Sequence, residues 1–375
     1  MNTLRRLIHR EVLITVAFVA LAFLALFAFF DLVDQLGDVG KGQAGRTYTL
    51  GHAALYMLLW TPSRLYELMP IAVLIGTIIV MARFAQSSEF TILRTSGMGP
   101  WRALRTLLLI GAAFTAFTFA LGDYIAPLST RSAEIMKAGY MGQVNLGQTG
   151  AWLKERQQFS NYAVNVAGLE GTTGMRGIRI FEFNTQGILV STITAERGDF
   201  GTDAAWNLHG VQRSEFFTGD TTKDGVPSAH VQHDSVAVNF SWPTELNAEM
   251  VSVALLKPER MGTLDLFQYT QHLQANGQSS QRYEIEFWRK VFYPLSCVVM
   301  VVLALPFAYL HFRSGAISGY VFMGVMVGIS FFLLNNVFGY IGDLNNWKPW
   351  LAAAVPGMLY TAASLGAFSW LVLRR

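Results

Sequence analysis

The stretch Val12–Phe30, VLITVAFVALAFLALFAFF, decides the class of this protein, because nineteen consecutive residues carry no charge. A helix needs about 20 apolar residues to cross the hydrocarbon core of a bilayer. The stretch is too long for a signal-peptide core, and it runs into DLVDQL without a small-residue cleavage site. We therefore predict that it is retained as a first membrane span.

Similar apolar blocks recur along the chain, which has 375 residues, 52% of them hydrophobic and 14% charged. This composition is typical of an integral membrane protein. The net charge of +3 and the lack of a run rich in Lys and Arg argue against nucleic-acid binding, and the single Cys297 excludes an intrachain disulfide. We expect six spans in two groups of three, at Val12–Phe30, Leu50–Ala82, Thr106–Gly122, Val291–Leu310, Ser314–Gly342 and Pro349–Leu373.

Basic residues set the expected orientation, because Lys and Arg gather in the cytoplasmic loops of membrane proteins. With both termini in the cytoplasm, ten basic residues lie inside, whereas the short outer loops hold only Lys41, Arg46 and Lys348. This arrangement predicts three domains. Residues 1–123 would hold spans one to three, residues 124–283 an outer polar domain, and residues 284–375 spans four to six.

The outer domain has the pattern of antiparallel β-structure. IRIFEFNTQGILVSTIT, Ile178–Thr194, contains two alternating runs around Asn184–Gly187, a composition that is typical of a hairpin turn. Ile180 and Val190 are candidate inward positions. We expect an antiparallel sandwich or open jelly roll, with further strands at Phe159–Val166, Ala205–Phe216 and Ser235–Phe240 and a short helix that ends at Gly277.

Between spans two and three, residues 87–97 predict a short helix at the cytoplasmic surface. A serine can cap it, an acidic residue lies near its start, a basic one near its end, and glycine stops it. So short a helix needs a surface to dock on, which can be lipid headgroups or another protein. Its key residues are Ser88, Glu89, Phe90, Leu93, Arg94 and Gly97.

Charged residues also lie near the predicted outer surface. Arg64 precedes Arg83 by 19 residues, or roughly 28 Å of helix, and Glu67 follows it at a spacing that allows an ion pair. Asp34 reaches a similar depth at the end of span one, and Arg289 with Lys290 opens span four. Such residues can contact a ligand. Alternatively, they pair with one another or extend their charged ends to the lipid headgroups.

Other patterns carry less information. Gly324 and Gly328 in span five allow close helix approach. His230 and His233 face opposite ways on a strand, so we expect no metal site. We find no catalytic constellation and no phosphate-binding G-x-x-x-x-G-K-[ST] motif, so the chain is not expected to be an enzyme.

Four separated motifs carry a resemblance to a known family. FDLVDQL, YELMPIAVLIG, SSEFTILRTSGM and FRSGAISGYVFMGVMVGISFFLLNN occur in the order found in the LptF/LptG family, and the resemblance covers the whole chain. These proteins are the permease subunits of the transporter that extracts lipopolysaccharide from the inner membrane of Gram-negative bacteria. The resemblance implies a multi-pass inner-membrane protein whose β-domain, of jelly-roll type, lies in the periplasm.

The resemblance also implies partners and roles. The helix at 87–97 would be the coupling helix that docks on an LptB-type ATPase dimer, which would bind ATP and Mg, so this chain would hold no cofactor. A second LptF/LptG-type permease and an LptC-type single-span protein would complete the complex. Spans one and five, the latter with Gly324 and Gly328, would line lateral gates.

One departure from the family concerns lipopolysaccharide phosphates. Relatives carry lysines beside the V-D-Q-L segment, whereas this chain has Asp31 and Asp38 there. The lipid-binding role would then move to a wider set of residues, with Lys137 matching a basic position in relatives. The set is Asp34, Lys41, Arg46, Arg64, Glu67, Arg131 and Lys137. The competing functions are the paralogous permease and a membrane-anchored periplasmic binding or sensing protein.

Overall fold

The structure is a computed structural model that describes residues 2–42, 47–87, 100–141, 151–157, 159–170, 174–201, 205–218, 229–246, 250–251, 258–309 and 317–370. It divides into two compact units. The helical unit comprises Met1–Gly40, Tyr48–Ala133 and Gln281–Arg375. The β unit comprises Lys41–Thr47 and Glu134–Ser280.

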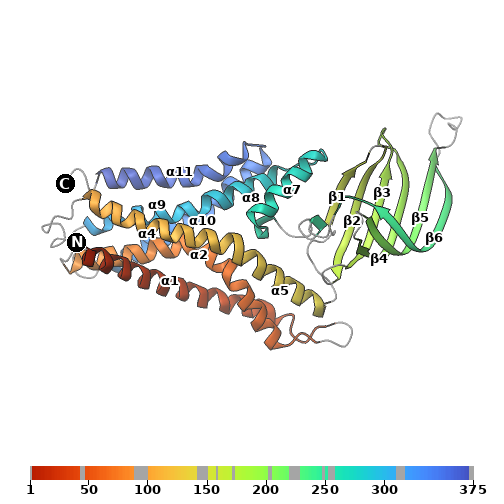
Figure 1. The fold of residues 1–375 in the computed structure, drawn as a ribbon. Coiled ribbons are helices and arrows are strands. Elements are labelled where there is room, and N and C mark those ends of the chain that lie inside the picture. Colours follow the sequence, from red (N-terminus) through yellow and green to blue (C-terminus); the bar gives the residue numbers. More distant parts are fainter. Residues whose placement is uncertain are drawn as a thin grey trace. The chain divides into compact units, whose positions relative to one another are not determined.

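Within the described residues, six helical stretches are long and apolar enough to cross a membrane, three before the strands and three after them. The expected membrane fold with an inserted antiparallel domain is therefore confirmed (Figure 1). The helices are α1 (Asn2–Leu36), α2 (Leu50–Gln86), α4 (Pro100–Ala120), α5 (Ala126–Met141), α8 (Gln281–Phe292), α9 (Ser296–Ala304), α10 (Ile317–Leu344) and α11 (Pro349–Phe368). Shorter helical turns are η1 (Leu121–Ile125), η3 (Tyr293–Leu295) and η4 (Leu305–Tyr309).

Helix α2 forms the centre of the helical unit. Its residues from Leu68 to Ile78 are all buried, as expected for a helix that is apolar on every side. Gly76 brings α2 against α1, since a Cβ there would lie 2.8 Å from the Cα of Val16. The core around α2 is completed by apolar residues of α1, α4, α9 and α10.

The third span continues beyond its predicted end at Gly122, so that boundary was wrong. A proline such as Pro127 usually ends or kinks a helix, because it has no N–H to donate to the preceding turn. Here the π-helical turn η1 ends at Ile125, two residues before the proline, and the amide of Ala126 donates to the carbonyl of Leu121, five residues back. This wider turn lets the helix pass the proline and continue as α5.

In the part of the β unit that the structure describes, six strands form one antiparallel sheet whose spatial order equals the chain order (Figure 1). The predicted hairpin is confirmed, because Asn184 Oδ1 accepts the amides of Gln186 and Ile188, and Gly187 has φ +79°. The strands are β1 (Ala151–Arg156), β2 (Asn161–Glu170), β3 (Gly174–Phe183), β4 (Leu189–Phe200), β5 (Ala205–Thr218) and β6 (Ala229–Pro243), followed by the turn η2 (Pro258–Arg260) and helix α7 (Thr263–Ala275).

The sheet curls until its two edges meet at one corner. Glu155 on β1 is buried and accepts a 2.5 Å bond from Thr244 Oγ1 and a 3.0 Å bond from the amide of Glu245, both just after β6. The rings of Tyr162 on β2 and Trp242 on β6 also meet, with centroids 5.5 Å apart. The curl encloses an apolar interior.

Strand register decides which residues reach that interior. Ile180 is only 1% exposed, so its predicted inward position is confirmed. Val190 is 36% exposed while the next residue, Ser191, is buried, so the inward prediction for Val190 was wrong. Alternation along a strand places these neighbours on opposite faces, and the sequence pattern did not identify which of them points inward.

Two glycines with positive φ, Gly177 and Gly210, each interrupt the regular backbone of a strand, and we call such an interruption a crease. Met175 and Ile178 on β3 are both fully buried although they are three residues apart, a spacing that normally puts side chains on opposite faces. Gly177 lies between them with φ +61°, and Gly210 on β5 has φ +65°. Because this backbone conformation costs residues with a Cβ about 1–2 kcal/mol, glycine permits the change of inward face.

Candidate functional site

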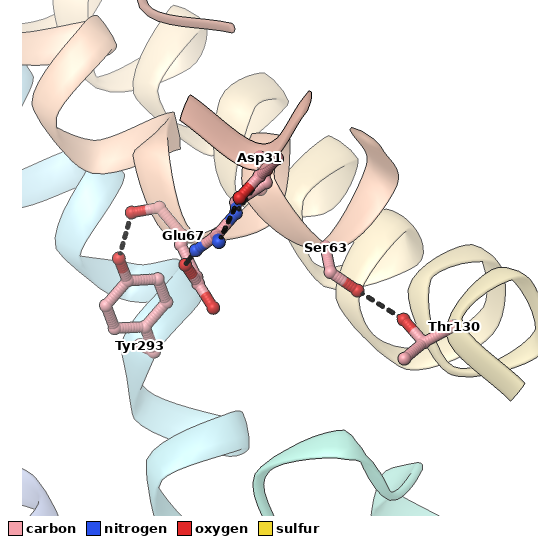
Figure 2. Close-up of polar contacts among 6 residues, drawn as sticks. Asp31, Ser63, Glu67, Thr130 and Tyr293 are labelled. Carbon is pink, nitrogen blue, oxygen red and sulfur yellow. Dashed lines mark hydrogen bonds and ion pairs between the residues drawn. The ribbon is translucent and has the colours of Figure 1, made fainter. Parts of the chain in front are cut away.

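An ion-pair cluster joins the ends of α1 and α2. Arg64 Nη2 lies 2.8 Å from Asp31 Oδ1, and Arg64 Nε lies 3.1 Å from Asp31 Oδ2 (Figure 2). The expected contact between Arg64 and Glu67 is present at 3.5 Å. The bidentate pair with Asp31 is the stronger interaction, because both oxygens accept a hydrogen bond from one guanidinium.

Aromatic rings shield the cluster. The Arg64 Cζ atom lies 5.7 Å from the ring centroids of both Phe27 and Trp60, and the Tyr56 ring lies 6.1 Å from that of Trp60. The side chains of Arg64 and Asp31 are only 30% and 23% exposed. The charge of Arg64 is therefore balanced within the helical unit, and the guanidinium also contacts aromatic faces.

A pocket of about 190 Å³ opens beside this cluster. Asp34 lines it and is exposed, as expected at the end of span one. The remaining lining residues come from the same two helices and combine aromatic and polar side chains. They are Asp31, Gln35, Tyr56, Met57, Trp60 and Arg64.

A second group of polar contacts ties the other spans together. The Tyr293 hydroxyl donates to the backbone carbonyl of Glu67 at 2.6 Å (Figure 2), and Lys290 Nζ donates to the carbonyl of Gly122 at 3.2 Å. Arg289 lies 2.6 Å from Glu286 Oε1 and 2.8 Å from Asn336 Oδ1. Internal pairing therefore accounts for Arg289 and Lys290, the charges at the start of span four.

Serine and threonine hydroxyl groups form hydrogen bonds between helix α5 and helix α2. Ser63 Oγ and Thr130 Oγ1 are 2.7 Å apart (Figure 2), and Ser129 Oγ donates to the carbonyl of Leu59 at 2.6 Å. These bonds place Arg131, the next residue of α5, on an exposed surface of the helix. Sequence reasoning missed Asp31 as the partner of Arg64, and it missed α5.

The predicted lipid-binding residues are distributed over both units. Arg64, Glu67 and Asp34 are together at the α1–α2 cluster, and Arg131 belongs to the same unit. Lys41, which is exposed, and Lys137 belong to the β unit. Arg46 lies outside the described residues, as do the six residues assigned to coupling, namely Ser88, Glu89, Phe90, Leu93, Arg94 and Gly97.

The two glycines of span five permit close packing, as predicted. A Cβ on Gly324 would lie 2.9 Å from Ile78 Cδ1, and a Cβ on Gly328 would lie 3.0 Å from Ile71 Cγ2. Both isoleucines are on α2, the central helix. Small residues let α10 approach α2 at these two levels.

Among the described residues of the β unit, Tyr162 and His272 have a pKa that is shifted by their surroundings. Burial lowers the pKa of His272 on α7, although Glu155 and a hydrogen bond to the carbonyl of Lys154 oppose the shift. The imidazole also stacks on Tyr269, with ring centroids 6.3 Å apart. Loss of solvation disfavours the imidazolium form, so His272 resists protonation in the folded chain.

This chain is similar in sequence to known proteins over nearly its whole length. The chain is 27% identical over 382 residues to the lipopolysaccharide export system permease protein LptG of Escherichia coli strain K12, covering 100% of this chain and 99% of that protein. It is 25% identical over 362 residues to LptG of Haemophilus influenzae strain Rd, covering 96% of each.

Both relatives are of the LptG type, which is the paralogue that the VDQL and YELMPIAVLIG segments resemble. A family model described as lipopolysaccharide export system permease LptF/LptG matches residues 6–374. With six membrane-spanning stretches and an inserted sheet, this chain is a multi-pass membrane protein and belongs to the LptF/LptG family.

Proposed function

We propose that this chain is one permease half of an ATP-driven transporter that extracts lipopolysaccharide from the outer leaflet of the inner membrane. The observation that carries the proposal is the family match over residues 6–374 on a chain with two sets of three spans. An LptF-type permease, an LptB-type ATPase dimer and an LptC-type protein would complete the assembly. Both termini would lie in the cytoplasm and the β unit in the periplasm.

Coupling to ATP hydrolysis is assigned to residues 88–97. The proposed helix would dock in the ATPase through Glu89 and Arg94, since a permease without nucleotide-binding machinery needs a lever that a partner can move. We expect Glu89→Arg to preserve membrane insertion yet reduce copurification of the ATPase and lipid-stimulated ATP hydrolysis. Gln86→Arg, a change at the exposed end of α2, serves as the matched control.

Normal assembly and ATP turnover in Glu89→Arg would assign this segment to the lipid surface. Failure of any ATP-binding subunit to copurify with the wild-type chain would favour the membrane-anchored binding or sensing protein.

Lipid extraction would depend on basic residues that face the phosphates and sugars of the lipid. We assign this role to Lys41, Arg46, Arg131 and Lys137, because Arg64 is already paired with Asp31. The Lys41→Gln, Lys137→Gln double variant should extract less lipid than either single variant, and raised salt should reproduce part of the defect for exposed members. Unchanged extraction would move phosphate recognition to the partner permease.

The curled sheet would carry the lipid onward toward a periplasmic bridge. Its interior is apolar and suits acyl chains, with Ile180 fully buried inside and Val190 on the outer face. A photo-crosslinking residue at position 180 should capture lipopolysaccharide in an ATP-dependent manner, and the same residue at position 190 is the control. Equal capture at the two positions, or capture at neither, would contradict a conduit through the interior.

A further inference from the structure

We infer that the outer face of strands β1–β3, together with the turn that joins β1 to β2, binds the surface of an anionic phospholipid bilayer. We call this surface the basic aromatic face. Its members are Trp152, Lys154, Arg156, Phe159, Arg179 and Phe181. The inference concerns a docking surface of the β unit and does not depend on which lipid the permease carries.

Strand β1 divides its side chains sharply between the two faces of the sheet. Leu153 and Glu155 are buried in the interior, whereas Trp152, Lys154 and Arg156 are exposed. Successive side chains of a strand point to opposite faces, so these three residues lie side by side on the outer face. One aromatic ring and two positive charges therefore come from a single strand.

Exposed aromatic rings give this face an apolar centre. The rings of Trp152 on β1 and Phe181 on β3 stack with centroids 5.9 Å apart. They reach each other across β2 because Ala163, the partner of Phe181 on that strand, has a small side chain. Trp152 is 49% exposed and Phe159 is 82% exposed. Clustered aromatic side chains that remain in water mark a surface that contacts a membrane or another protein.

The charge of the face is positive. Lys154, Arg156 and Arg179 are exposed, and none of them forms an ion pair within the described residues. The carboxylates of β1 and β3, Glu155 and Glu182, instead accept hydrogen bonds from hydroxyl groups in the interior of the curled sheet. No described acidic side chain of β1–β3 therefore lies on this face to neutralise it. An anionic surface would complement its charge.

A bilayer fits this face better than a freely diffusing acidic protein. Each Lys or Arg beside an anionic membrane contributes about fivefold to binding, so three of them contribute roughly 100-fold together. That is weak for a free partner. The β unit, however, is covalently joined to membrane spans, for example to α8 through residues 276–280, which keeps a bilayer at a high effective concentration. Trp and other aromatic residues also favour the interface between water and lipid.

The test follows docking of the β unit in the full chain onto its own bilayer, in nanodiscs without lipopolysaccharide. A fluorophore is attached at Phe159→Cys in a Cys297→Ala background, and nitroxides on the lipid headgroups quench it on contact. We expect strong quenching in nanodiscs that contain phosphatidylglycerol and about tenfold weaker docking in phosphatidylcholine alone. Raised salt should also weaken docking, since the charges are exposed.

Matched variants separate the face from a general effect of charge. Lys154→Gln and Arg179→Gln should each lower the ratio of docked to undocked chain about fivefold, and the double variant about 25-fold. Gln212→Glu changes the net charge by the same amount at an exposed position of β5, and it should alter the ratio less than about twofold. A fluorophore at Val236→Cys, 83% exposed on β6, should not be quenched.

Four outcomes would overturn the inference. The first is equal quenching in the two kinds of nanodisc, and the second is an unchanged ratio in the double variant. The third is quenching that requires added lipopolysaccharide, which would assign the face to the exported lipid. The fourth is a fluorophore at position 159 that lipid nitroxides never quench but that copurified partners shield, which would assign the face to a protein.

Discussion

Arg64 and Asp31 should be energetically coupled, and a double-mutant cycle can measure by how much. The perturbations are Arg64→Gln, Asp31→Asn and both together, in the full chain without added lipid. The two side chains are 30% and 23% exposed, which is intermediate between a surface pair and a buried one. Exposed pairs contribute about 0.2–1 kcal/mol, whereas breaking a buried pair costs about 3–5 kcal/mol.

We therefore expect each single variant to lose about 1–3 kcal/mol of unfolding free energy. The coupling energy between the two changes should be about 1–2 kcal/mol. The assay is equilibrium chemical unfolding in detergent, monitored by tryptophan fluorescence.

The pair of Arg83 and Glu11 is a built-in control, because its atoms are 3.7 Å apart and its side chains are 59% and 34% exposed. Its coupling should stay below about 0.5 kcal/mol. The reasoning would be refuted if the costs of Arg64→Gln and Asp31→Asn simply added, or if the control pair coupled as strongly.

Three further predictions concern packing, backbone and pH. Gly324→Leu and Gly328→Leu should each cost about 1–3 kcal/mol in the same assay because they force α10 away from α2, whereas Gly319→Ala, which meets open space, should not destabilise the chain. Gly210→Ala should cost about 1–2 kcal/mol and Gly210→Asn less, since asparagine tolerates positive φ and a Cβ there would meet only the flexible Glu196 side chain, at 3.3 Å; equal costs would contradict the crease. Because the folded-state pKa of His272 is lowered, stability should fall as pH drops through 6.5, and His272→Gln should flatten this dependence in unfolding measured from pH 5 to 8.

Sequence patterns correctly predicted those features that depend on neighbouring residues alone. The six spans could be identified because a bilayer requires about 20 apolar residues in a row, and the hairpin around Asn184 because its turn is set by neighbouring residues. The contact of Arg64 with Glu67 followed from their spacing on one helix. The bond to Asp31 joins residues 33 positions apart, so it depends on how α1 packs against α2.

Other features could not be predicted from the sequence, because two opposing effects act at the same position. A proline such as Pro127 usually ends or kinks a helix, and only the wide turn before it shows that this helix continues. The inward face of β4 could not be chosen between Val190 and its neighbour, because each face of the strand combines apolar with small polar residues. At Gly177 the alternation of inward and outward side chains shifts by one residue. A strict two-residue repeat therefore cannot predict all the inward residues of β3.

The π-helical turn at Leu121–Ile125 also sets the orientation of everything that follows it in α5. Such a turn holds one residue more than an α-helical turn, and each residue rotates a helix by about 100°. Loss of a single residue here would swing Thr130 away from Ser63 and turn Arg131 toward a different side of the helix. A one-codon deletion or insertion in this turn would thus redirect a basic surface of this chain without altering any of its side chains.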